Sequence, residues 1–179
     1  EQPPVVEPPV VEPPVVEPPV VEPPAVETGA FALWPGQEVR HEYGGSADTS
    51  AATVAFTVPK NLREGVMYHS LQVASSEDGR NGYRATVTLK ASGNIRLTVA
   101  KVSGNRSQVL KDVTVSGRGT YALGEDVQVS LRVVDGKVSA KAWAVKDDEP
   151  DWQITAPATS SAAGDSVVVI GYLSKVAPS

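Results

Sequence analysis

The most constraining feature of this chain is an alternation of apolar and polar residues with a period of two, clearest between Tyr83 and Trp152. Residues 83–90, 95–99, 127–133 and 138–143 all alternate in this way, as strands with one buried and one solvated face do. Asp135-Gly136 separates the last two segments and predicts a tight hairpin, because type I′ turns need positive φ angles. The stretch therefore predicts antiparallel sheet.

Segments before and after this stretch have the same character. They lie at residues 37–43, 53–58, 66–74, 107–115 and 167–173, with residues 30–34 as a candidate first strand. Residues 167–173 are almost continuously apolar, which is typical of a strand inside a sheet. Small and polar residues at 44–50, 116–119 and 156–165 predict loops. About ten short strands and no window of helical period predict an all-β fold, an antiparallel jelly-roll β-sandwich over residues 29–179.

Residues 1–28 differ from the rest of the chain. The unit Pro-Pro-Val-Val-Glu recurs from Pro3 to Glu27, with Ala25 in place of Val in the last copy. Two prolines in each unit remove backbone donors and fix φ, so neither a helix nor an interior strand can form. The repeat predicts an extended polyproline II stalk that acts as a spacer. A ligand for a proline-recognition domain is the alternative.

The distribution of charge excludes some partners. Residues 1–27 hold six Glu and no Lys or Arg, whereas the rest of the chain holds all 16 basic residues and 15 of the 21 acidic ones. Without a basic stripe, nucleic-acid binding has little electrostatic support. The absence of cysteine excludes a disulfide scaffold, and no apolar run is long enough for membrane insertion. Because the chain starts at Glu1 and has no signal-peptide pattern, we expect a mature product or a fragment.

Two groups of motifs resemble a known family. They are Tyr83-Arg84-Ala85 with Ile95-Arg96-Leu97, and Ala140-Lys141-Ala142-Trp143 with Glu149-Pro150-Asp151-Trp152-Gln153. Both are similar to motifs of the concanavalin A-like, laminin-G-like jelly rolls of actinobacteria and their phages, and the similarity spans residues 50–176. The family's usual opening, Asp-x-Phe followed by Trp-Gly, is absent. The resemblance implies a module appended to secreted carbohydrate-active enzymes, or one carried by minor tail and other virion proteins.

Few residues have the spacing that catalysis or metal binding needs. His41 and His69 are the only histidines, and neither has a second ligand at regular spacing, so we expect both to be structural or exposed. No predicted strand carries the paired carboxylates of sugar hydrolysis, so we predict no catalytic residue, no enzymatic activity and no cofactor. Asp147, Asp148 and Asp151 form an acidic loop, which is a candidate for calcium with a solvated turn as the alternative.

Three aromatic residues are candidates for ligand binding: Trp143, Trp152 and Tyr68. Trp143 and Trp152 bracket the acidic loop. An exposed indole stacks on a sugar ring, whereas a buried one contributes packing area. We expect Trp152 to fold back near Trp143 and clamp the loop, because Pro150 restricts the chain between them. A sugar-binding platform is the alternative.

These observations predict a non-enzymatic surface-display or adhesion module on a proline-rich stalk. From the resemblance we expect it in a phage virion, as a tail or capsid appendage, or at a cell surface, in contact with host glycans. The stalk is expected to join it to other virion domains or to a parent protein, and an oligomer is compatible with the sequence. The alternatives are a carbohydrate-binding module of a secreted polysaccharide-active enzyme and a decoration domain without a ligand.

Overall fold

The computed structural model describes residues 32–60, 62, 65–76, 80–90, 94–159 and 164–174, with the backbone alone at 45–49, 116–120 and 164–165. This part of the chain contains ten strands and no helix. The strands are β1 (Glu38–Thr49), β2 (Ala51–Thr57), β3 (Val66–Ala74), β4 (Asn81–Lys90), β5 (Asn94–Ser103), β6 (Arg106–Thr120), β7 (Asp126–Val134), β8 (Lys137–Ala144), β9 (Ile154–Pro157) and β10 (Gly164–Leu173). Within the described ranges, no helix could therefore cross a membrane. The predicted stalk, residues 1–28, lies outside these ranges and stays a prediction.

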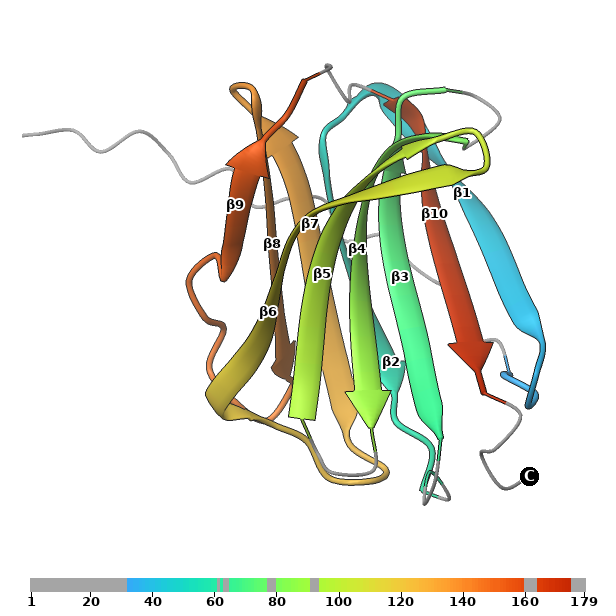
Figure 1. The fold of residues 1–179 in the computed structure, drawn as a ribbon, viewed down its shortest axis with the longest axis vertical. Coiled ribbons are helices and arrows are strands. Elements are labelled where there is room, and N and C mark those ends of the chain that lie inside the picture. The colour runs from blue at the N-terminus through green and yellow to red at the C-terminus, as the bar shows by residue number, and fades with distance from the viewer. Residues whose placement is uncertain are drawn as a thin grey trace, which may run out of the picture.

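The strands form two antiparallel sheets that pack face to face (Figure 1). Sheet A has six strands in the order β1-β10-β3-β4-β5-β6, and sheet B has four in the order β2-β7-β8-β9. Neighbours in sheet A are not always consecutive along the chain, because β10 inserts between β1 and β3. The predicted all-β sandwich is therefore confirmed for the described residues, and the apolar strand at 167–173 lies inside a sheet as expected.

The core lies between the two sheets and consists of the inward residues of each alternating strand. In β4 and β5 these residues are fully buried, and they are Tyr83, Ala85, Val87, Leu89, Ile95, Leu97 and Val99. From sheet B, Val129, Leu131, Val138 and Ala140 face them and are equally buried. Period-two alternation puts every second side chain into this layer, so the sequence pattern and the burial pattern agree.

The hairpin between β7 and β8 follows the predicted turn chemistry. Val134 pairs with Lys137, which leaves Asp135 and Gly136 as a two-residue loop. Both have positive φ angles, 51° and 67°, as the two central residues of a type I′ turn require. The turn fixes the register of β7 against β8 and therefore decides which of their side chains face outward.

The start of the predicted fold differs from the structure. Residues 32–34 are not in a strand, and Trp34 is 63% exposed. Pro35 forms only an isolated parallel bridge to Leu173, and the Gly36 amide donates to the Leu173 carbonyl at 2.7 Å. Proline lacks an amide hydrogen, which limits strand pairing at this position. The first and last described segments therefore meet at one end of sheet A.

Three predicted loops are partly strand. The backbone of β1 continues to Thr49 across a register shift after Gly44, and β6 continues through 116–119 to Thr120. Bulges let strands continue through glycine-rich segments that sequence patterns assign to loops. Residues 154–157 form the short strand β9 on the edge of sheet B. Four residues are too few for a clear alternation signal, which is why this strand was missed.

Candidate functional site

The two candidate tryptophans lie on the outer face of sheet B, beneath and within the loop of residues 145–153. Trp143 at the end of β8 is only 7% exposed, and every residue of β8 after Lys137 is buried. The loop after β8 covers the face that would otherwise be solvated. Trp143 therefore offers little surface to a ligand, whereas Trp152 is half-buried.

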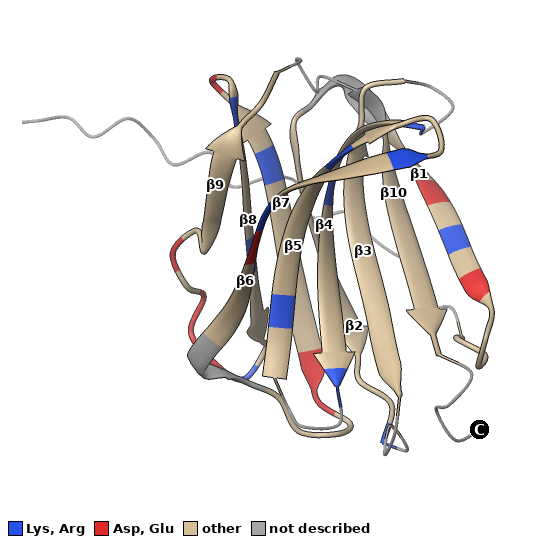
Figure 2. Ribbon diagram, in the orientation of Figure 1, with Lys and Arg blue, Asp and Glu red and all other residues tan. Residues whose placement is uncertain are grey.

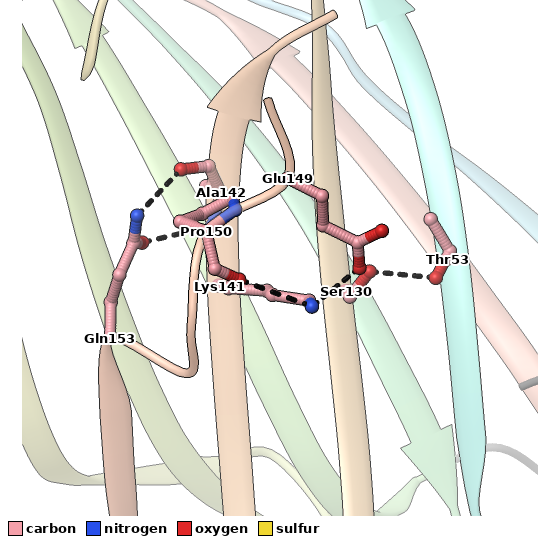
Figure 3. A network of polar contacts seen from close by, with 7 residues as sticks. All are labelled: Thr53, Ser130, Lys141, Ala142, Glu149, Pro150 and Gln153. Carbon is pink, nitrogen blue, oxygen red and sulfur yellow. Dashed lines mark hydrogen bonds and ion pairs between the residues drawn. The ribbon is translucent and has the colours of Figure 1, made fainter. Parts of the chain in front are cut away.

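Lys141 connects this loop to sheet B. Its ammonium forms an ion pair with Glu149 and donates to the Pro150 carbonyl at 3.3 Å (Figure 3). The same ammonium lies 4.6 Å from the ring centroid of Trp152 and 5.6 Å from that of Trp143. The Lys141 ammonium therefore connects the two tryptophans, because a cation is attracted to the face of an indole ring.

Two further contacts hold the loop. The guanidinium of Arg132 lies 4.3 Å from the Trp152 ring centroid. The side-chain amide of Gln153 accepts from the Ala142 amide and donates to the Ala142 carbonyl, both at 3.0 Å (Figure 3). Gln153 therefore takes the place of a strand partner beyond the last paired residue of β8 and β9. These contacts support the clamp interpretation of the Trp143 and Trp152 motif.

Replacing Trp152 by Ala is expected to lower the free energy of unfolding by about 2 kcal/mol. The change removes two cation–π contacts, each worth ~0.5–1 kcal/mol at a partly exposed site, and the apolar area of a half-buried ring. Thermal or urea unfolding of the two proteins would measure it. Trp34→Ala is the matched control, since that indole is 63% exposed and its loss should change stability by less than ~0.5 kcal/mol. Equal stability of the Trp152 variant and the parent would contradict the clamp.

The acidic loop carries the candidate calcium ligands Asp147, Asp148 and Asp151. Glu149 is paired with Lys141, and Asp148 and Asp151 are exposed. Over the described residues, no three His, Cys, Asp or Glu side chains gather as a metal-binding group. Calcium at Asp147, Asp148 and Asp151 stays a prediction that a titration would test.

The third candidate, Tyr68, lies on the other sheet. It projects from the outer face of sheet A and is 39% exposed, with its ring centroid 6.0 Å from that of Tyr172. The two rings belong to the neighbouring strands β3 and β10, where they are register partners. They border a hollow of about 380 Å³, here called the tyrosine hollow, which is lined by Glu38, Tyr68, Ser70, Arg84, Thr86, Ile170 and Tyr172.

Three polar side chains of the tyrosine hollow, those of Ser70, Arg84 and Thr86, are held in place by hydrogen bonds. Ser70 and Thr86 are register partners on β3 and β4, and their hydroxyl oxygens are 2.8 Å apart. Arg84 donates from Nε and Nη2 to Oε1 of Gln72, at 3.0 and 2.8 Å. Side chains fixed on rigid strands lose little freedom when a ligand binds, which favours affinity.

A second hollow adjoins the first. It has a volume of about 470 Å³ and is called the arginine pocket, lined by Arg40, Arg80, Arg84, Val102, Gly104, Asn105, Arg106 and Ser107. The free end of the β5–β6 hairpin bends across β4 and β3 in Figure 1 and forms one wall of this pocket. Arg84 lines both hollows. Arg84 therefore links the two hollows on the outer face of sheet A.

Sequence reasoning found Tyr68 but missed Tyr172 and the four arginines. Arg80 and Arg84 are close in sequence, just before β4 and within it. Tyr172, Arg40 and Arg106 belong to β10, β1 and β6, so only the register of the strands brings them together with β4. Arg84 carries a partial signal, because it occupies an outward position in the alternating strand that starts at Tyr83. Its pKa is lowered, first by burial and then by the charge of Arg40, while Glu38 raises it.

The other perturbed groups in the described ranges are structural. Burial lowers the pKa of His69 to about 4, and its ring stacks on Phe56 in the core with 4.1 Å between centroids. Burial raises the pKa of Tyr121 to about 12, and its hydroxyl donates to the Lys90 carbonyl. The pKa of Glu125 is lowered by hydrogen bonds from Lys146 and the Ala122 amide. None of these three lines the tyrosine hollow or the arginine pocket.

Comparison with known proteins shows a distant likeness in fold. No family model matches the chain, and neither does any curated protein. Sheep galectin-11, solved with glycerol, is 5% identical over 80% of this chain and 95% of its own, with a TM-score of 0.46. The CBM2 module of the evolved Dit of Lactobacillus casei BL23 phage J-1 is 10% identical over 83% of this chain and 72% of its own, with a TM-score of 0.41. Domains LG4-5 of the mouse laminin α1 chain are 14% identical, over 79% of this chain and 36% of theirs, with a TM-score of 0.26. No binding residue of this chain follows from these similarities.

Proposed function

We propose that this chain is a non-enzymatic adhesion module that binds a glycan on the outer face of sheet A. The single observation that carries the proposal is the tyrosine hollow, where two aromatic rings lie beside fixed hydroxyl and guanidinium groups. An aromatic face packs against the C–H face of a sugar ring, and the neighbouring polar groups bond its hydroxyls. Both needs are met within one hollow.

The shape of the site also suits a chain-like ligand. The hollow is open to solvent and continues into the arginine pocket through Arg84. An extended oligosaccharide would lie across neighbouring strands and contact both hollows at once. The only carboxylate that lines the tyrosine hollow, among the described residues, is that of Glu38. Hydrolysis of a glycosidic bond generally needs two carboxyl groups, so we propose binding without turnover.

The biological setting is also part of the proposal. The resemblance to actinobacterial and phage jelly rolls favours a virion or cell-surface appendage, with residues 1–28 as the spacer that presents the module to a surface. In that setting the ligand is a polysaccharide of the host envelope. The proline-rich spacer would keep the outer face of sheet A away from the particle that carries it.

The test is glycan binding by variants of the two tyrosines. Tyr68→Ala and Tyr172→Ala are each expected to weaken binding to a recognised oligosaccharide at least about tenfold, as the loss of a stacking contact does. A glycan array would identify the ligand, and calorimetry would compare the variants. Each variant should lose about 1 kcal/mol of stability, since Tyr68 is partly exposed, Tyr172 is half-buried and their cross-strand contact is removed. Thermal unfolding would show that both variants stay folded.

Trp152→Ala is the control that separates the two outer faces. It removes an aromatic ring from sheet B and leaves sheet A untouched. Retained binding by this variant, with loss in both tyrosine variants, would support the site on sheet A. Loss of binding in the Trp152 variant, with binding retained in both tyrosine variants, would instead assign the glycan site to the loop of residues 145–153 on sheet B. Release of reducing sugar by the parent protein would contradict the non-enzymatic part of the proposal.

A further inference from the structure

The arginine pocket concentrates positive charge at one end of the proposed glycan site. Its four arginines come from β1, from the segment before β4, from β4 itself and from the start of β6. No acidic side chain lines it among the residues that the structure describes. In β1, Arg40 alternates with Glu38 and Glu42 (Figure 2), and neither of these two lines the pocket.

Arg84 lies at the junction and is oriented for recognition. Its Nε and Nη2 both bond Gln72, which fixes the plane of the guanidinium. The group is half-buried; burial and the charge of Arg40 lower its pKa, and the charge of Glu38 partly offsets them. Cations held together in a partly desolvated site repel one another, and an anion placed between them relieves that repulsion.

The chemistry of the donors favours an oxyanion with two or more oxygens. Guanidinium groups match carboxylate and sulfate oxygens through paired hydrogen bonds, more specifically than ammonium groups do. Asn105 and Ser107 on the hairpin add neutral polar groups to the same pocket. The opposite end of the surface differs, because Glu38 lines the tyrosine hollow and would repel an anion there.

We propose that the ligand is an acidic polysaccharide, with a neutral sugar ring on Tyr68 and Tyr172 and the carboxylate or sulfate of a neighbouring residue in the arginine pocket. This inference rests on the proposed glycan-binding function and specifies its substrate class. The charge difference between the two hollows determines the direction in which the polysaccharide lies across sheet A. Arg84, which lines both, contacts the ligand at the link between the two sugars.

The first test compares oligosaccharides that differ only in charge, with the full chain as the protein. Hyaluronan oligosaccharides, which alternate a uronate with a neutral N-acetylhexosamine, are paired with the same oligomers after reduction of their carboxyl groups. Chondroitin sulfate oligosaccharides with reduced carboxyl groups are paired with the same oligomers after desulfation, so that the second member of each pair is neutral. Calorimetry should show the charged member of at least one pair binding about tenfold or more tightly. The two pairs distinguish a carboxylate from a sulfate. Raising the salt concentration should lower the affinity for the charged ligand and leave the affinity for the neutral one unchanged.

The second test uses variants of the arginine pocket. Arg106→Gln and Arg40→Gln should each reduce binding of the charged oligosaccharide about tenfold and leave the neutral one unchanged. Arg96→Gln is the matched control, because Arg96 is exposed, pairs with Asp112 and lines neither hollow. Thermal unfolding would show that each variant is folded.

The outcomes separate this inference from the proposed function. Equal affinity for charged and neutral members would overturn the acidic-ligand inference and leave glycan binding in place. Binding that depends on the arginines but not on Tyr68 or Tyr172 would overturn the proposal that one ligand occupies both hollows. No binding to any oligosaccharide, together with tight binding of a synthetic peptide of residues 1–27, would overturn both and assign the pocket to the chain's own acidic repeat.

Discussion

Acidification from pH 7 to pH 4 is expected to destabilise the sandwich by about 3 kcal/mol through His69 alone. The folded protein holds this imidazole neutral, with its pKa lowered by burial from 6.5 to about 4. The unfolded chain takes up a proton below pH 6.5, whereas the folded chain does so only near pH 4. Stability from this group is therefore complete above pH 6.5 and falls as the pH drops to about 4, with about 1.4 kcal/mol for each unit of difference in pKa.

The measurement is urea unfolding at pH 7, 6, 5 and 4 for the parent and for His69→Leu. Leucine has a similar volume and no titratable group, and the contact with Phe56 stays apolar. The variant should lose most of the pH dependence between 6.5 and 4, while the part due to carboxylates such as Glu125 persists at the acidic end. Parallel stability curves for the two proteins across this range would show that His69 is not the source.

Gly82→Ala is expected to destabilise the protein by about 3 kcal/mol or more, and to prevent folding if the parent is marginally stable. Gly82 lies in β4 between Ala74 of β3 and Val102 of β5, with a φ angle of 144°. A Cβ atom there would lie 2.1 Å from the Val73 carbonyl oxygen. Since that oxygen belongs to the backbone of a paired strand, it cannot move without breaking the sheet.

Gly44→Ala is the control for this experiment. Gly44 also lies in a strand of sheet A, but a Cβ atom added to it meets nothing within 4 Å. Its substitution should change the free energy of unfolding by less than ~1 kcal/mol. Comparable melting temperatures for Gly82→Ala and the parent would mean that β3 and β4 separate more easily than the register implies.

Much of the fold could be predicted from the sequence, because short stretches of residues identify most of the strands and one of the turns. Alternation in β4, β5, β7 and β8 identifies the strands and their buried faces, and Asp135-Gly136 determines the turn between the last two. The alternation pattern fails where strand formation depends on pairing with a segment that is distant in sequence. Strand β9 is only four residues long, and β1 and β6 continue through segments rich in glycine. Pairing with a neighbouring strand outweighs local preference in those places.

The candidate site was less predictable for the same reason. Tyr68 could be chosen as an exposed aromatic residue, but its partner Tyr172 is determined by the register of β3 against β10. The arginine pocket needs a further non-local event, the bend of the β5–β6 hairpin over the sheet. Trp143 and Trp152 were found as a motif, since they are only nine positions apart and the loop between them is short. Their contact through Lys141 could not be read from spacing.

The closeness of Gly36 and Leu173 has a mechanical consequence. The chain enters β1 and leaves β10 at the same end of sheet A, and these two strands are antiparallel neighbours. Tension that pulls the two flanks apart would therefore peel β1 from β10 one residue pair after another instead of sliding all pairs at once. The first pairs to open include Glu38–Tyr172 and Arg40–Ile170, which border the two hollows. Tension applied to both flanks would therefore open the tyrosine hollow and the arginine pocket at low force, before most of the sandwich unfolds.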